Sequence, residues 1–159
     1  MKVREIMTSP VITVREDTPL EEVAEIMLKH KIGGVPVVGE RGEVVGIVTE
    51  TDFTVRERGF PFSTFRAPQV FGQWLPKEGV ERIYDAARST TAKEIMTRRV
   101  KTITEDESVE EVLELMLRHD VNRIPVIKPG KVPVGIVARH DLLRMMSDSL
   151  RQVRSAGRV

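Results

Sequence analysis

The chain has 159 residues, of which 40% are apolar and 31% are charged, a composition typical of a folded globular protein. Basic and acidic residues number 25 and 24, so no excess of positive charge indicates a nucleic-acid partner. No apolar run reaches the roughly 18 residues of a membrane span, and the lack of cysteine excludes disulfides and thiolate chemistry. The charged first residues do not resemble a signal peptide, so we expect a cytoplasmic protein with no membrane partner.

The first third of the chain predicts a β-α-β-β-α order of elements. These are a strand at Val11–Val14, a helix at Pro19–Lys29, strands at Val35–Val38 and Val44–Val48, and a helix that begins near Thr49–Thr51. Thr18, Pro19 and Glu21 predict a capping box with proline at the first helical position. The glycine-rich sequence GERGE predicts the turn between the second and third strands.

The seven aromatic residues all lie in the segment from Phe53 to Tyr84. We assign residues 59–91 to a connector with a helix near residues 77–89. A disordered tether would be poor in aromatic residues, so this connector should pack against another part of the protein. It could cover the core, form a dimer contact or act as a lid over a cleft.

The chain then repeats the first pattern 89 residues later. The elements are a strand at Val100–Ile103, a helix at Ser108–Arg118, strands at Ile124–Ile127 and Val134–Ala138, and a helix that begins near Ala138–His140. Glu5–Phe53 aligns with Glu94–Leu142 without a gap, and 22 of the 49 pairs are identical. We therefore assign residues 1–58 to one motif, 92–150 to a second and 151–159 to a basic tail.

One motif of about 50 residues buries too little surface to be robust alone. We therefore expect an α/β protein of the α+β type. Its two tandem β-α-β-β-α motifs should pair face to face about a pseudo-twofold axis and form two related clefts between them.

Three short patterns occur in the same order in both motifs. Met-Thr-x-x-Val stands near the start, Pro-Val in the middle and Gly-Ile-Val-x-x-x-Asp at the end. This set resembles the cystathionine-β-synthase (CBS) domain, two copies of which make a CBS pair or Bateman module. The resemblance covers about 100 residues and implies a stand-alone pair that binds an adenosine-containing ligand, forms a homodimer and regulates an unidentified protein.

The sequence GIVTETDF, from Gly46 to Phe53, should supply the main ligand-binding side chains of one cleft, which we expect to be the better of the two. Thr49 and Asp52 are three residues apart at a helix start, so their side chains share a face. A carboxylate there can accept hydrogen bonds from both ribose hydroxyls, as an acidic residue does in dinucleotide-binding folds. The same spacing also fits a capping box that only satisfies backbone N–H groups.

The resemblance implies that a nucleotide held by one motif points its phosphates at the other. The better cleft would be formed by Ile47, Val48, Thr49, Thr51, Asp52, Lys101, Asn122, Arg123 and His140. The weaker cleft would be formed by Ile12, Gly34, Val137 and Asp141. Arg123 can bind a phosphate with two hydrogen bonds, but a surface salt bridge is the alternative. His140 could equally be a solvated residue of a helix start.

These features favour a non-catalytic sensor of AMP, ADP or ATP. S-adenosylmethionine is less favoured because Arg123 suits a phosphate. The three histidines do not form an H-x-x-x-H pattern, so we expect that no metal is required. The sequence also lacks a nucleophile–base set that would indicate an enzyme. Two alternatives are a ligand-free scaffold that works through dimerisation and a nucleic-acid-binding protein that uses the arginines of the tail: Arg151, Arg154 and Arg158.

Overall fold

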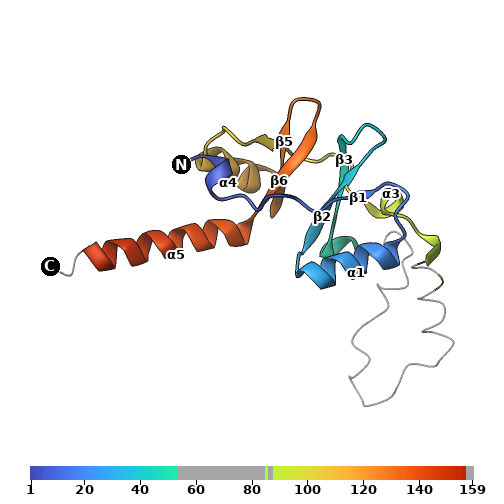
Figure 1. Cartoon of the computed structure of the whole chain (residues 1–159), viewed down its shortest axis with the longest axis horizontal. Coiled ribbons are helices and arrows are strands. Elements are labelled where there is room, and N and C mark those ends of the chain that lie inside the picture. Colours follow the sequence, from blue (N-terminus) through green and yellow to red (C-terminus); the bar gives the residue numbers. More distant parts are fainter. Residues whose placement is uncertain (54–84, 86–87, 157–159) are drawn as a thin grey trace, which may run out of the picture. The chain divides into compact units, whose positions relative to one another are not determined.

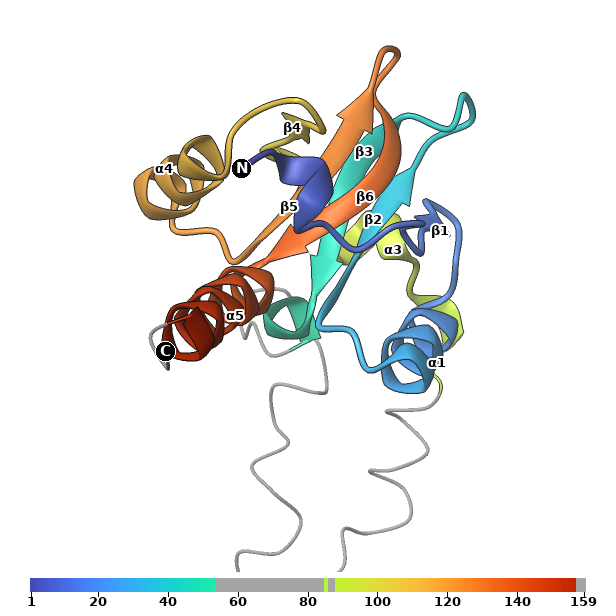
Figure 2. The same cartoon turned by 60° about the vertical axis from the view of Figure 1, so that its left-hand side comes forward.

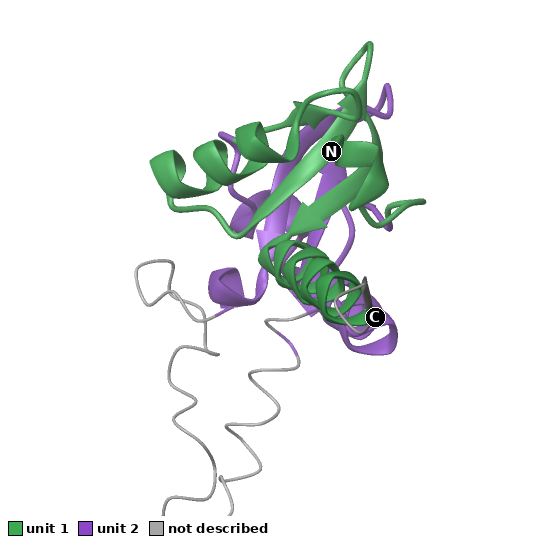
Figure 3. Ribbon diagram, turned by 90° about the vertical axis from the view of Figure 1, so that its left-hand side faces the viewer, with its two compact units in different colours: residues 1–11, 100–159 green, residues 12–99 purple. Residues whose placement is uncertain are grey.

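The computed structural model describes residues 1–53, 85 and 88–156 (Figure 1). The chain divides into two compact units, which Figure 3 distinguishes by colour. Unit 1 comprises Met1–Val11 with Val100–Val159, and unit 2 comprises Ile12–Arg99.

The first residues of each repeat belong to the unit that holds the sheet of the other repeat. Met7 and Thr8 lie in unit 1 with the second repeat, whereas Met96 and Thr97 lie in unit 2 with the first. The compact units thus group residues by packing, while the boundaries predicted from the sequence group them by repeat.

Unit 2 contains a three-stranded mixed sheet with the strand order β1-β2-β3. Its elements are β1 (Val14–Arg15), α1 (Leu20–His30), β2 (Gly34–Val38), β3 (Val44–Thr49), the 3-10 helix η2 (Glu50–Phe53) and α3 (Ala92–Ile95). β1 pairs with β2 in parallel, and β2 pairs with β3 in antiparallel. Gly42 has a φ of 76° in the predicted turn between β2 and β3, a conformation that glycine adopts without strain.

Unit 1 repeats this arrangement with the strand order β4-β5-β6. Its elements are the 3-10 helix η1 (Val3–Glu5), β4 (Ile103–Thr104), α4 (Val109–His119), β5 (Arg123–Lys128), β6 (Val132–Ala138) and α5 (Arg139–Ala156). In Figure 2, β5 and β6 form a hairpin, and α4 and α5 lie on the same side of it. The predicted α/β class and the two tandem motifs are confirmed.

The predicted first strands are longer than the observed ones. Val11–Val14 and Val100–Ile103 were each expected to be extended strands, but β1 and β4 contain two residues each and begin at Val14 and Ile103. Only these residues pair with the neighbouring strand, Val14 with Val37 and Ile103 with Val126.

The capping box predicted at Thr18 is wrong. α1 begins at Leu20 after Pro19, and no side chain caps it. The Thr18 hydroxyl instead accepts a hydrogen bond from the Arg15 N–H at 3.0 Å. The Leu20 N–H donates to the Thr90 carbonyl at 2.8 Å, so the segment before α3 supplies an acceptor at this helix start.

The equivalent helix α4 does begin with a capping box. The Glu111 N–H donates to the Ser108 hydroxyl at 3.2 Å, and the Ser108 N–H donates to the Glu111 carboxylate at 2.8 Å. Ser108 stands where the first repeat has Pro19, which has no N–H to donate. The two helices therefore start with different chemistry at the same place in the repeat.

The Met-Thr segments pair with the last strand of each sheet. Thr8 exchanges two backbone hydrogen bonds with Ile136, at 2.9 and 3.0 Å, and Thr97 exchanges two with Ile47, at 2.9 and 3.0 Å. Gly135 and Gly46 lie beneath the neighbouring methionines, because a Cβ atom there would clash with the Met7 or Met96 side chain. A glycine at each of these positions thus permits close approach of the Met-Thr segment to the strand.

Each unit has its own apolar core. Fully buried Leu20, Val23 and Val48 anchor the core of unit 2, and its crossing segment, which is the first residues of the other repeat, adds Ala92, Ile95 and Met96. In unit 1, Val112, Ile124, Val126 and Val137 are fully buried, and the crossing segment adds Val3. A buried side chain of this size contributes about 1.5–3 kcal/mol relative to an exposed one, so both crossing segments are part of the folding of their units.

The connector prediction falls almost wholly outside the described residues. Asp85, Arg88 and Ser89 are described and helical, and they lie within the predicted helix near residues 77–89. Within the part of the chain that the structure describes, no helix is long and apolar enough to span a membrane.

Candidate functional site

In unit 2, the predicted ligand residues gather where β3 ends and η2 begins. Thr49 is the last residue of β3 and pairs with Gly34 of β2, while Asp52 lies in η2. The Glu50 N–H donates to the Gly33 carbonyl at 3.2 Å, which ties the start of η2 to the start of β2. Ile47 and Val48 precede Thr49 in the strand, and both are buried.

Asp52 is the buried charge of this cluster, with 8% of its surface exposed. One carboxylate oxygen accepts the Thr49 N–H at 2.7 Å and lies 3.3 Å from the Thr49 hydroxyl. The Thr49 and Thr51 hydroxyls lie 2.8 Å apart. Two hydroxyls and a carboxylate therefore stand within four residues, a set that can donate to and accept from a polyhydroxylated ligand.

In unit 1, the equivalent cluster lies where β6 ends and α5 begins. Arg123 of β5 pairs with Ala138 of β6, and the Arg139 N–H donates to the Asn122 carbonyl at 2.9 Å. Asp141 is 7% exposed and accepts the Ala138 N–H at 2.7 Å. The cluster thus repeats the backbone contact of Asp52 without a threonine hydroxyl.

The polar side chains around Asp141 differ from those around Asp52. Arg123 is half-buried, whereas Asn122 and His140 are exposed. An Arg144 nitrogen lies 3.9 Å from the second carboxylate oxygen of Asp141. Sequence reasoning missed Arg144, although the spacing of three helical residues between Asp141 and Arg144 was a usable signal.

The structure groups the predicted site residues by unit. Unit 2 brings together Gly34, Ile47, Val48, Thr49, Thr51 and Asp52, and unit 1 brings together Asn122, Arg123, Val137, His140 and Asp141. Ile12 and Lys101 occupy equivalent places two residues before β1 and β4; Ile12 is half-buried and Lys101 is exposed. Each predicted cleft takes residues from both units, and this pairing stays a prediction.

The ligand-binding and the capping interpretations of Thr49-x-x-Asp52 both assume that a helix starts at Thr49. The backbone contact from Thr49 to Asp52 is the reciprocal half of a capping box, and Asp141 makes the same contact with Ala138. The capping role of the carboxylate is therefore present in both units. Across the described ranges, no group of three or more histidine, cysteine, aspartate or glutamate side chains could hold a metal ion.

A comparison with protein families finds one matching domain twice. The CBS domain profile matches residues 3–57 and 92–148. YlbB of Bacillus subtilis, an uncharacterised protein, is 35% identical over 145 residues that cover 89% of this chain and 79% of YlbB. Three further curated relatives are enzymes, and the chain spans only 23–24% of their length.

Solved structures show the same architecture. The CBS domain of a CBS domain containing membrane protein from Sphaerobacter thermophilus superposes with a TM-score of 0.76 and 44% identity, over 91% of this chain and 86% of that one. The CBS domain pair of protein MJ0100, in complex with 5′-methylthioadenosine and S-adenosyl-L-methionine, superposes with a TM-score of 0.67 and 29% identity. That match covers 92% of this chain and 99% of the other.

Proposed function

This chain belongs to the CBS domain family, and on that premise we propose that it is a non-catalytic module that binds AMP, ADP or ATP. Binding shifts the balance between conformations of the module, and a regulated protein partner responds to the shift. Its place of action is the cytoplasm, where these nucleotides are present.

The observation that carries the proposal is the cluster at the end of β3. Asp52 is held in place by the Thr49 N–H at 2.7 Å, so its carboxylate needs little reorganisation to accept ribose hydroxyls. The adjacent Thr49 and Thr51 hydroxyls add donors and acceptors on the exposed side of this turn. Ile47 and Val48 supply the apolar strand beside which we place the base.

The choice of ligand class is supported by a relative and by one arginine. The MJ0100 pair was crystallised with two adenosine compounds, 5′-methylthioadenosine and S-adenosyl-L-methionine. In this chain Arg123 is half-buried at the start of β5, where a guanidinium can bind phosphate with two parallel hydrogen bonds. We therefore assign a phosphate-bearing ligand ahead of S-adenosylmethionine, with no metal required.

We propose that the two clefts are unequal. The better one combines the Asp52 cluster with Lys101, Asn122, Arg123 and His140, and the weaker one combines Ile12 and Gly34 with Val137 and Asp141. Asp141 has Ala138 in place of a threonine three residues before it. Gly34 occupies the position that Arg123 occupies in the second repeat, so the weaker cleft lacks that guanidinium.

Isothermal titration calorimetry with AMP, ADP and ATP tests the proposal directly. We expect one strong site per chain for at least one nucleotide, and a free energy of unfolding raised by about 2.7 kcal/mol at 100 times the dissociation constant. Asp52→Ala should abolish this binding, whereas Asp141→Ala, the matched control, should leave it in place. Absence of heat with all three nucleotides and with S-adenosylmethionine would refute the sensor.

A second candidate function is a ligand-free interaction module. The exposed apolar side chains of α5, among them Leu143, Leu150 and Val153, favour it. It predicts no nucleotide binding, and loss of a protein contact when this helix is changed. In this alternative the aromatic connector could also be the interaction surface, and its aromatic residues from Phe60 to Tyr84 lie outside the described residues. Nucleic-acid binding remains the third alternative, with affinity that falls steeply as salt rises.

A further inference from the structure

Met7 and Met96 occupy equivalent places in the two repeats but differ in their exposure to solvent. Each stands in the sequence Glu-Ile-Met-Thr, and each packs on a glycine, Gly135 for Met7 and Gly46 for Met96. Met96 is 3% exposed and belongs to the core of unit 2. Met7 is half-buried and packs at the border of the core of unit 1. The two thioethers thus have the same chemistry in different surroundings.

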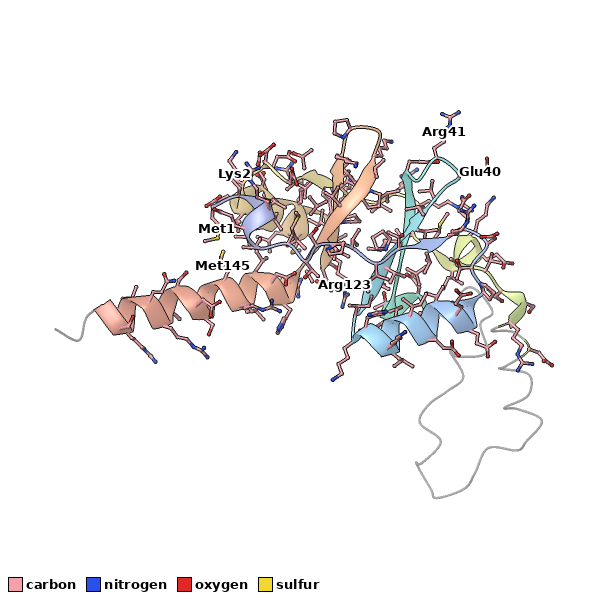
Figure 4. All side chains as sticks on the ribbon, in the orientation of Figure 1. Met1, Lys2, Glu40, Arg41, Arg123 and Met145 are labelled. Carbon is pink, nitrogen blue, oxygen red and sulfur yellow. The ribbon has the colours of Figure 1, made fainter. Side chains whose placement is uncertain are left out.

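Met7 also lines a cavity of unit 1 between the N-terminal segment and α5. The cavity has a volume of about 410 Å³, large compared with the roughly 30 Å³ that a water molecule takes up in the liquid. Two more methionines in its lining, Met1 and Met145, are labelled in Figure 4. Arg144 and Asp148 also line the cavity, and both are exposed, so solvent enters it. An oxidant close to water in size can therefore approach Met7 from this side.

The sulfur of Met7 lies beside the backbone contact between Thr8 and β6. It is 2.6 Å from the point that a Cβ atom on Gly135 would occupy, and the Thr8 carbonyl oxygen is 3.1 Å from the same point. That carbonyl accepts the Ile136 N–H at 3.0 Å, and the Thr8 N–H donates to the Ile136 carbonyl at 2.9 Å. An atom added to this sulfur therefore lies near the two hydrogen bonds that hold the N-terminal segment on the sheet.

We propose that Met7 is a modification site for hydrogen peroxide, and that its oxidation loosens the N-terminal segment from β6. A lone pair of the thioether sulfur attacks one peroxide oxygen, the O–O bond breaks and an S–O bond forms, which gives methionine sulfoxide. The other oxygen leaves as hydroxide and takes the proton of the sulfur-bound hydroxyl to become water. The sulfur loses two electrons, and these reduce the peroxide.

The sulfoxide oxygen places a hydrogen-bond acceptor beside another acceptor. The thioether packs as an apolar group, whereas the sulfoxide is polar, and the Thr8 carbonyl oxygen borders the same space at Gly135. Two acceptors with no donor between them are unfavourable, so the segment shifts and its hydrogen bonds with Ile136 weaken. The N-terminal part of unit 1 ends at Val11, so oxidation acts on the segment by which the chain leaves this unit. The effect does not depend on nucleotide binding.

Peptide mass spectrometry after brief treatment of the folded protein with hydrogen peroxide tests the site. Met7 should gain one oxygen atom at least about tenfold faster than Met96, because oxidation of a methionine follows its exposure. Met1, which is 61% exposed, gives the rate of an open methionine, and Met116, which is 4% exposed, gives the rate of a second buried one. Oxidation of Met7 as slow as that of Met96 overturns the proposal.

Amide hydrogen exchange tests the consequence of oxidation. The Thr8 and Ile136 amides should exchange at least about tenfold faster in the oxidised protein, whereas the Thr97 and Ile47 amides of the equivalent contact in unit 2 should keep their rates. Methionine sulfoxide reductases, one for each sulfoxide epimer, should restore the original rates. Unchanged exchange at Thr8 and Ile136 in protein oxidised at Met7 overturns the proposal, and so does equal acceleration at all four amides.

Two leucine variants assign the effect to one thioether of the cavity. Met7→Leu keeps an apolar side chain of similar size that peroxide does not oxidise, so treatment should leave its exchange rates unchanged. Met145→Leu removes another thioether from the same cavity, so treatment should still accelerate exchange at Thr8 and Ile136. The reverse result would assign the effect to Met145 and overturn the proposal. If Met7→Leu does not fold, the reductases decide: exchange that stays fast after the Met7 sulfoxide has been reduced also overturns it.

Discussion

Unit 2 and unit 1 hold the same buried aspartate, Asp52 and Asp141, in the same backbone contact. Each accepts the N–H of the residue three positions before it at 2.7 Å. They differ in the side chain of that residue, a threonine in unit 2 and an alanine in unit 1. The shared contact gives the aspartate a role in folding in both units, so the local difference between them is the pair of hydroxyls on Thr49 and Thr51.

The largest effect that we expect is a difference in lost stability between alanine substitutions of Gly46 and Gly135, the two glycines packed against methionines. In Gly46→Ala, the new Cβ would clash most closely with the Met96 sulfur and would lie 2.8 Å from Cγ and 3.1 Å from Cβ of Met96, which is 3% exposed. In Gly135→Ala, the nearest atom is the Met7 sulfur at 2.6 Å, and Met7 is only half-buried. We expect chemical denaturation to show a loss of about 3 kcal/mol for Gly46→Ala and about 1 kcal/mol for Gly135→Ala.

The predicted difference between Gly46→Ala and Gly135→Ala depends on the Met7 side chain, and not the backbone, limiting the space at Gly135. The Thr8 carbonyl oxygen would lie 3.1 Å from the new Cβ at position 135, and backbone moves less readily than a side chain. Equal losses for the two variants would mean that this carbonyl, and not the methionine, limits the space in unit 1.

The sequence predicts the helices and long strands well because each has a strong local signal. Apolar residues at helical spacing mark α1 and α4, and the glycine- or proline-rich turns mark the two hairpins. The short first strands were misjudged because only two residues of each find a partner. The predicted cap at Thr18 is absent, and the Thr90 carbonyl, 70 residues after Leu20, supplies the acceptor for the Leu20 N–H.

The candidate site was predictable only in part for a related reason. Thr49 with Asp52, and Ala138 with Asp141, are local pairs, and the structure places them as the spacing indicates. The exchange of Met-Thr segments between the two repeats is a tertiary feature, because both segments contain the same local sequence, Glu-Ile-Met-Thr. Nothing in the repeat tells which sheet each segment joins.

The second largest effect concerns the hydroxyl of Thr49. Thr49→Ala gives unit 2 the residue that unit 1 has, and should weaken nucleotide binding about tenfold, the effect of one lost hydrogen bond. Ala138→Thr makes the reverse change in unit 1 and should increase the number of ligands bound per chain. Calorimetric stoichiometry checks both variants. Two equal sites in the unchanged chain would contradict the asymmetry.

A smaller effect should distinguish the starts of α1 and α4. Ser108→Ala removes the hydroxyl that accepts the Glu111 N–H and should lower the free energy of unfolding by about 1 kcal/mol. Thr18→Ala removes an acceptor of the Arg15 N–H in an exposed turn, so its loss should be smaller. Urea titrations of the two variants provide the measurement. An equal or larger loss for Thr18→Ala would show that the turn before α1 contributes as much as a helix cap.

The smallest effect lies in the pH dependence of the first turn of α4. Hydrogen bonds from the backbone N–H of Glu110 and from Ser108 lower the pKa of the Glu110 carboxyl. A lowered pKa in the folded state means that the ionised carboxylate adds stability above its unfolded pKa, about 4.3 for a free glutamate. This contribution disappears as the pH falls through the folded pKa. Glu110→Gln should therefore be less stable than the unchanged chain at neutral pH and equally stable in acid below both pKa values, as measured by thermal melts. A difference that persists unchanged into acid would assign the role of Glu110 to packing, because only the charged form is favoured by these hydrogen bonds.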